Sequence, residues 1–106
     1  MEEISATEAA QMLRDQPDQT ILLDVREAVE LETAAVAGAL HLPMGEIPGR
    51  LEEIDASKTI ICMCRSGGRS AQVAEFLLAQ GYAKAVNLTG GIHAWSDLVD
   101  SSIPKY

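Results

Sequence analysis

Cys64 lies in a segment whose residue types and spacing suit nucleophilic chemistry on a small anion. Two glycines, Gly67 and Gly68, follow this thiol, and two arginines, Arg65 and Arg69, bracket the glycines. Glycines let backbone N–H groups turn toward an anion, and the start of a following helix adds partial positive charge. A thiol at such a place loses its proton easily, and the thiolate is the nucleophile. The expected anion-binding loop comprises Arg65, Ser66, Gly67, Gly68 and Arg69.

Two elements are expected to position this loop. Residues 59–63 form a short apolar run that is typical of a buried strand, and residues 70–80 have a helical pattern. In parallel sheets, ligands bind outside the carboxyl ends of the strands. Cys64 directly follows the strand of residues 59–63, so the reactive thiol is predicted at that edge of the sheet.

The rest of the chain alternates between strands and helices. Ser5 and Glu8 have the spacing of a capping box, which starts a first helix that ends before residue 15. Further strands are expected at residues 20–25, 39–42 and 84–88, and further helical segments at 27–32, 46–54 and 92–99. This alternation predicts an α/β domain with a mostly parallel sheet and helices on both faces.

Length and charge limit the possible functions. The 106 residues correspond to one domain, 1–106, with a core from about residue 5 to 98 and a frayed tail at 101–106. The net charge of −8 argues against nucleic acid or an anionic membrane as a partner. Such a charge also repels an anionic substrate, so anion attraction must be local, and Arg65 and Arg69 are its expected sources. No apolar signal segment is evident, so we expect a reduced, cytoplasmic protein.

Neither cysteine is expected to form a disulfide or a metal site. Cys62 and Cys64 are two residues apart, and we expect their side chains to point to opposite faces of the strand. Cys62 is then most simply a small core residue. A zinc site needs further cysteines or histidines at suitable spacing, and His41 and His93 are isolated. We therefore expect no metal and no cofactor.

Four segments together resemble the rhodanese family, and specifically its small single-domain sulfurtransferases. They are Leu22 to Glu27, Gly38 to Pro43, the loop Cys64 to Ser70, and Gly81-Tyr82 with Asn87 to Trp95. One departure is visible, because Ala34-Ala35-Val36 stands where the family usually has Gly-His-Ile. The resemblance implies a rhodanese-like three-layer fold with a mostly parallel five-stranded sheet.

The resemblance also implies a sulfur-transfer cycle. The Cys64 thiolate would attack the outer sulfur of thiosulfate, release sulfite and carry a persulfide, which cyanide or a thiol, including a thiol on a protein, would then remove. An alternative is a non-enzymatic persulfide carrier or a partner-binding module in a sulfur pathway. A phosphatase or arsenate reductase is disfavoured, because related phosphatases have five residues between cysteine and arginine, and here four separate Cys64 from Arg69.

Several polar residues near the loop have expected supporting roles. Asp24 is expected to brace the loop through hydrogen bonds, and Arg26 to pair with Glu30 at the i,i+4 spacing. For Arg69 two interpretations stay open, contact with the substrate anion or an ion pair with Asp24. Arg65 is expected to face solvent and attract the substrate. His41, His93 and Trp95 are expected to be structural.

Overall fold

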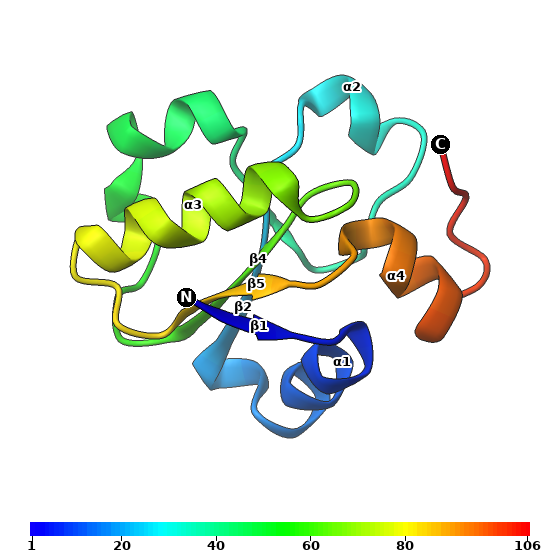
Figure 1. The fold of residues 1–106 in the computed structure, drawn as a ribbon, viewed down its shortest axis with the longest axis horizontal. Helices are drawn as coiled ribbons and strands as arrows, with labels where there is room; N and C mark the ends of the chain where they lie inside the picture. Colours follow the sequence, from blue (N-terminus) through cyan, green and yellow to red (C-terminus); the bar gives the residue numbers. More distant parts are fainter.

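The computed structural model describes residues 1–106 and contains one five-stranded sheet (Figure 1). The strands lie in the order β1-β5-β4-β2-β3, and every neighbouring pair is parallel. Their bounds are β1 (Glu2–Ile4), β2 (Thr20–Asp24), β3 (Leu40–His41), β4 (Thr59–Met63) and β5 (Ala85–Leu88). The predicted α/β class is confirmed, and the sheet is wholly parallel.

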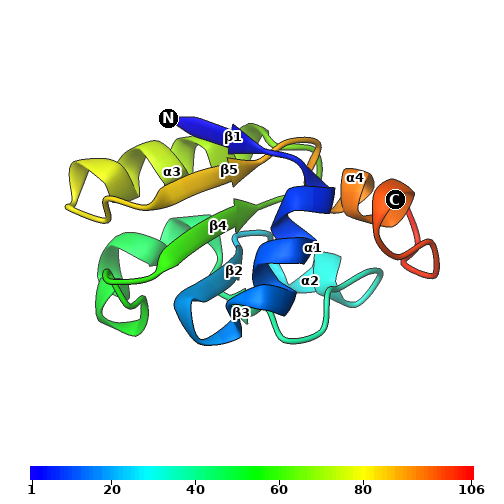
Figure 2. The same ribbon diagram turned by 90° about the horizontal axis from the view of Figure 1, so that it is seen from below.

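Helices cover both faces of the sheet (Figures 1 and 2). They are α1 (Ala6–Asp15), α2 (Ala28–Leu31), α3 (Gly68–Ala79) and α4 (Gly91–Leu98), with short 3-10 helices η1 (Pro17–Gln19), η2 (Met44–Gly49) and η3 (Leu51–Glu53). Helices α1 and α4 pack on one face, whereas α3 and η2 pack on the other. The predicted capping box starts α1, since Ser5 Oγ accepts from the Glu8 N–H at 3.1 Å and Glu8 Oε1 accepts from the Ser5 N–H at 3.2 Å. None of these helices is long and apolar enough to cross a membrane.

Strand β1 is the element that the residue pattern did not predict. It has three residues, two of them exposed glutamates, and only Ile4 is buried. Its place in the sheet comes from parallel pairing with β5, where Ile4 lies opposite Leu88. Pairing with a strand some 80 residues away leaves no local signal, so only the family resemblance implied a fifth strand.

Strand β4 separates two hydrophobic cores. Ile61 and Met63 face α1 and α4, and Ile60 and Cys62 face α3. Cys64 belongs to the same core as Cys62, so the expectation that the two thiols point to opposite faces was wrong. Side chains alternate with a period of two, and residues i and i+2 therefore share a face. Both cysteines are free thiols.

The expected frayed tail is packed against the domain. Ile103 is buried, and its carbonyl oxygen accepts a hydrogen bond of 2.7 Å from the Ser96 hydroxyl. Tyr106 is half-buried and its hydroxyl contacts Arg26 and Glu30. The tail contacts the domain through an apolar side chain, Ile103, and a phenol, Tyr106. The polar residues Ser101 and Ser102 gave no sign of these contacts in the sequence.

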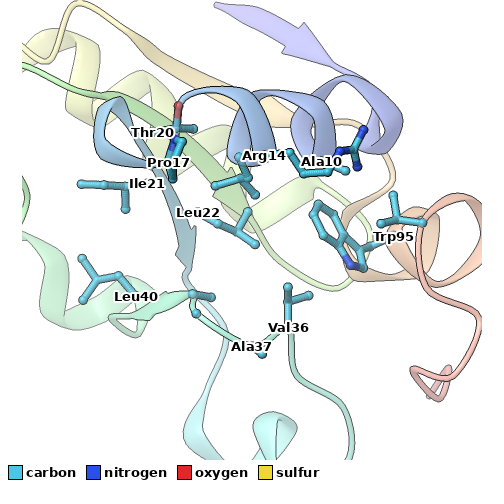
Figure 3. A pocket seen from close by; sticks show the side chains of 14 residues that line it. Ala10, Arg14, Pro17, Thr20, Ile21, Leu22, Val36, Ala37, Leu40 and Trp95 are labelled. Atoms are coloured by element: carbon cyan, nitrogen blue, oxygen red, sulfur yellow. The ribbon is translucent and has the colours of Figure 1, made fainter.

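An apolar groove of about 560 Å³ lies on the α1 face of the sheet (Figure 3). Its lining includes Leu22 of β2, Val36 of the connection into β3, Leu40 of β3 and Trp95 of α4. Val36 belongs to the segment in which the sequence departs from the rhodanese pattern. No residue of the Cys64 loop lines this groove.

Candidate active site

Cys64 directly follows β4, and its sulfur lies inside the turn that leads into α3. The Gly67 N–H donates a hydrogen bond of 3.1 Å to Cys64 Sγ. Gly67 has a φ of +115°, which a side chain would strain, so a glycine is needed where the backbone turns toward the sulfur. Helix α3 begins at Gly68, two residues earlier than predicted, so the loop is also the start of the helix. Cys64 itself is 2% exposed.

The start of α4 fixes the outer side of the same loop. The N–H groups of Ile92 and His93 donate to the carbonyl oxygens of Cys64 and Arg65, at 2.9 and 3.2 Å. A Cβ on Gly91 would lie 2.4 Å from the Cys64 carbonyl oxygen, so only glycine allows this approach. Because these carbonyls point toward α4, the N–H groups that follow are free to point toward the sulfur.

Two polar residues that were not predicted as site residues complete the surroundings of the sulfur. The Ser70 hydroxyl lies 3.3 Å from Cys64 Sγ and 2.6 Å from Asn87 Oδ1. Asn87 Nδ2 in turn donates to the Gly67 carbonyl oxygen at 3.1 Å. The available signal was Asn87 itself, since a polar residue inside the buried strand β5 needs partners.

These contacts favour ionisation of Cys64. Burial alone raises the pKa of the Cys64 thiol, but hydrogen bonds from the Ser70 hydroxyl and from the N–H groups of Ser70, Gly67 and Ser66 outweigh it, and the net pKa is lowered. For Cys62, burial and the nearby Cys64 raise the pKa of the thiol to about 12. The two thiols are thus chemically distinct, as the sequence analysis expected.

Arg69 forms an ion pair that neither earlier interpretation included. Its Nη1 and Nη2 donate to the two carboxylate oxygens of Glu30, at 2.7 and 2.8 Å. Chiefly through this contact, and against burial, the pKa of Glu30 falls to about 2. Arg69 therefore makes no pair with Asp24, and its guanidinium is already bound beside the loop.

Asp24 and Arg26 pair with each other. Arg26 is fully buried, and its Nε and Nη2 donate to the Asp24 carboxylate at 2.9 and 2.7 Å. The expected Arg26–Glu30 pair was wrong because Arg26 precedes the start of α2 at Ala28, so helical i,i+4 spacing does not apply. The expected hydrogen bonds from Asp24 to the loop were also wrong, since the Asp24 carboxylate accepts hydrogen bonds from Arg26 alone.

Arg65 is exposed, as expected, but its guanidinium contacts the tail. Nη2 donates to the Tyr106 backbone oxygen, and the guanidinium carbon lies 5.0 Å from the centre of the Tyr106 ring. Nε lies 3.3 Å from Nε2 of His93, so His93 borders the site instead of packing elsewhere. His41 contacts the Arg26 carbonyl oxygen at 2.6 Å, and Trp95 is buried, so both are structural as predicted. No group of three or more His, Cys, Asp or Glu side chains is arranged to hold a metal ion.

Comparison with known proteins agrees with this geometry. The sequence profile of the rhodanese-like domain matches residues 5–98. The chain belongs to the rhodanese-like family. It is 40% identical over 94 residues to a protein named sulfurtransferase from Allochromatium vinosum, covering 89% of this chain and 87% of that one. It is also 35% identical over 89 residues to a putative sulfur carrier protein, YrkF, from Bacillus subtilis, covering 84% of this chain and 48% of that one.

Solved rhodanese-like structures have the same fold. The crystal structure of a rhodanese-like domain protein from Staphylococcus aureus superposes with a TM-score of 0.84 and 31% identity, over 100% of this chain and 99% of that one. The predicted family and fold are thereby confirmed, and the relative from Allochromatium vinosum is named a sulfurtransferase.

Proposed function

We propose that this rhodanese-like protein is an enzyme that transfers the sulfane sulfur of thiosulfate to a thiol or cyanide acceptor through a Cys64 persulfide. The proposal rests on the surroundings of the Cys64 sulfur. This sulfur accepts hydrogen bonds inside the loop between β4 and α3, and these lower the pKa of the Cys64 thiol. A thiolate is the form that attacks sulfur.

The proposed cycle has two displacements at sulfur. The Cys64 thiolate attacks the outer sulfur of thiosulfate, a new S–S bond forms, and the S–S bond of thiosulfate breaks with its electron pair leaving on sulfite. The acceptor thiolate or cyanide then attacks the outer sulfur of the persulfide, and the Cys64 thiolate leaves. In each step one bond to sulfur forms and one S–S bond breaks, and the electron pair of the broken bond leaves with the leaving group. The cycle therefore needs no external oxidant or reductant.

The loop supports both anionic forms of Cys64 in this cycle, the thiolate and the persulfide. A persulfide carries negative charge at neutral pH, and N–H groups aimed at the reacting sulfur stabilise such charge in a site from which water is largely excluded. The N–H groups of Ser66, Gly67 and Ser70 act in this way on Cys64. Of the proposed binding loop, Arg65 is the cation that remains exposed to an incoming anion, whereas Arg69 is paired with Glu30.

A persulfide carrier is the second candidate, and two observations favour it. The net charge of −8 disfavours capture of a small dianion from solution, and a relative is named a putative sulfur carrier. In that case the sulfur arrives from another protein and leaves to another thiol, and Cys64 has the same role. Sulfur added to Cys64 is compatible with both candidates, which differ in whether thiosulfate and a small acceptor support turnover.

Phosphatase chemistry is less well supported. Four residues separate Cys64 from Arg69, against five between cysteine and arginine in the related phosphatases. The Arg69 guanidinium, which would have to bind a phosphate, is occupied by both oxygens of Glu30.

Mass spectrometry after exposure to thiosulfate tests the proposal. We expect one sulfur atom to be added to Cys64, in the wild type and in Cys62→Ser, and no addition in Cys64→Ser. Turnover of thiosulfate with cyanide then separates enzyme from carrier. Loading without turnover would support the carrier, and a sulfur added to Cys62 instead of Cys64 would contradict the assignment.

A further inference from the structure

Tyr106 contacts charged residues on both sides of the Cys64 loop. The chain returns after α4 toward α2, which places this residue beside the site (Figure 1). Its hydroxyl accepts a hydrogen bond of 2.8 Å from Arg26 Nη1 and donates one of 2.8 Å to Glu30 Oε1. No other side chain outside the loop reaches both Arg65 and the partner of Arg69.

The hydroxyl of Tyr106 links two ion pairs into one chain of contacts. Asp24 pairs with Arg26 at the end of β2, and Glu30 pairs with Arg69 at the start of α3. Both oxygens of the Glu30 carboxylate bind Arg69, and Oε1 also accepts from Tyr106. A donor on that carboxylate disperses part of its charge, so Glu30 neutralises Arg69 less completely.

The ring of Tyr106 contacts the other arginine of the loop. The Arg65 guanidinium carbon lies 5.0 Å from the ring centre, within the range of cation–π attraction. His93 meets the same ring edge to face, with centroids 5.8 Å apart. The ring therefore limits where the exposed Arg65 side chain lies relative to Cys64, which immediately precedes it.

We propose that Tyr106 is a positioning residue for anion capture, because it fixes Arg65 through its ring and the Glu30–Arg69 pair through its hydroxyl. The inference rests on the proposed function, since it concerns how the site attracts an anionic sulfur donor. Tyr106 does not touch the reacting sulfur. It acts through the two arginines, which set the positive potential that an anion meets at Cys64.

The test compares an anionic and a neutral alkylating agent of similar size. Iodoacetate and iodoacetamide both react with the Cys64 thiolate, so the ratio of their rates reports the local potential and needs no sulfur transfer. In Tyr106→Phe, which keeps the ring, we expect the iodoacetate-to-iodoacetamide ratio to fall about threefold, the size of one lost hydrogen bond. The matched control is Tyr82→Phe, since the Tyr82 hydroxyl donates to the Leu51 carbonyl oxygen away from the loop. An unchanged ratio in Tyr106→Phe, or an equal fall in both variants, would overturn the proposal.

A double variant tests the route through Glu30. Glu30→Gln removes the carboxylate on which the hydroxyl acts, so adding Tyr106→Phe to it should change the ratio much less than in the wild type. Thermal melting of each variant shows whether the fold is kept. Independent, additive effects of the two substitutions would show that Tyr106 does not act through Glu30 and would overturn that route.

Thiosulfate kinetics connect the inference to the reaction. We expect Tyr106→Phe to raise KM for thiosulfate about threefold with kcat within about twofold of the wild type. If the wild type does not turn over thiosulfate, the proposed function fails, and the alkylation ratio still decides the role of Tyr106. If the wild type is active and Tyr106→Phe lowers kcat with KM unchanged, Tyr106 shapes the reacting group and the positioning proposal is wrong.

Discussion

At the scale of single residues, the ionisation of Cys64 depends on the Ser70 hydroxyl. This group has one hydrogen to donate and two possible acceptors, Cys64 Sγ and Asn87 Oδ1. Ser70 Oγ lies 2.6 Å from Asn87 Oδ1 and 3.3 Å from Cys64 Sγ. With a protonated thiol, Ser70 donates to Asn87 and accepts from the S–H group. With a thiolate, the hydroxyl hydrogen can turn to the sulfur. As a donor to the thiolate, the Ser70 hydroxyl favours the ionised form of Cys64, and it does so without acting as a base that removes the thiol proton.

Replacement of Ser70 should make Cys64 less acidic. The Ser70 hydroxyl is the strongest of the contacts that lower the pKa of Cys64, so Ser70→Ala should raise this pKa by up to about one unit, equivalent to one net hydrogen bond. The thiolate fraction at a given pH then falls, and the pH profile of iodoacetamide alkylation moves to higher pH. Ser66→Ala is the control, because Ser66 contributes its backbone N–H and keeps it. An identical midpoint in Ser70→Ala and wild type would rule out this role.

Glu30 should contribute to stability only above a certain pH. Its pKa is about 2 in the folded protein against an ordinary value of 4.5, mainly because of Arg69. A lowered pKa means that the stabilisation is complete above about pH 4.5 and is lost as the pH falls toward 2. The difference in unfolding free energy between wild type and Glu30→Gln, measured by urea denaturation, should therefore shrink across this window. Glu27→Gln, which removes no ion pair, should show no such trend, and a difference that does not depend on pH would refute the expectation.

The placement of the proposed nucleophile was more predictable than the ion pairs around it. Cys64 and the glycine loop are contiguous, so their position between β4 and α3 could be predicted from the sequence. The partners of Arg26 and Arg69 come from different elements, and local i,i+4 spacing pointed to the wrong pair. Tyr106 could not be assigned at all, because its contacts join residues up to 80 positions away in the sequence.

At the scale of elements, the loop is set by two helix starts that approach it from different sides. Helix α3 supplies N–H groups to the sulfur, and α4 binds the carbonyl oxygens of Cys64 and Arg65. The alternation of strands and helices predicted β4 and α3 well, since an apolar run and a helical pattern are local features. It gave no sign that the start of α4 contacts the loop, because Gly90 and Gly91 read only as the end of a strand.

Gly91→Ala should damage both stability and reactivity. The new Cβ would lie 2.4 Å from the Cys64 carbonyl oxygen, at a residue whose φ is +58°, so the loop or α4 must move. We expect a loss of about 1–3 kcal/mol in unfolding free energy. We also expect a higher pKa for the Cys64 thiol, because the loop N–H groups would no longer point toward its sulfur. Gly45→Ala is the control, since its Cβ would meet no atom within 4 Å. Urea denaturation and alkylation profiles measure the two effects, and a fully stable, fully reactive Gly91→Ala would contradict this account.

At the scale of the whole molecule, an acidic protein carries a small basic area at its proposed anion site. The formal net charge is −8, while Arg65 is exposed at the loop and Arg69 lies beside it. Attraction of a dianion then depends on short-range contacts in an unfavourable overall field. Salt weakens both the local attraction by the arginines and the repulsion by the overall negative charge, since the Debye length is about 8 Å at physiological ionic strength.

Arg65→Ala should therefore weaken anion capture in a salt-dependent way. We expect KM for thiosulfate to rise more than kcat falls, with the rise becoming smaller as sodium chloride increases. Arg14→Ala is the matched control, because it makes the same change in net charge at an exposed arginine on α1, beside the apolar groove. Equal effects of both substitutions would mean that only the overall field matters. A loss confined to kcat and independent of salt would mean that Arg65 shapes the site and does not attract the donor.

For the proposed Cys64 persulfide, the position of Cys62 bears on how long the added sulfur atom would stay bound. Attack by this thiol on the sulfur of Cys64 that carries the persulfide would expel hydrosulfide and leave a disulfide, ending the cycle. Burial is the main cause that raises the pKa of the Cys62 thiol, so the thiolate needed for this attack is disfavoured near neutral pH. Residues i and i+2 of a strand are also about 7 Å apart at Cα, at the upper limit for a disulfide. In the proposed cycle, attack by Cys62 on a Cys64 persulfide is therefore disfavoured, and the lifetime of that persulfide would depend on the arrival of an external acceptor.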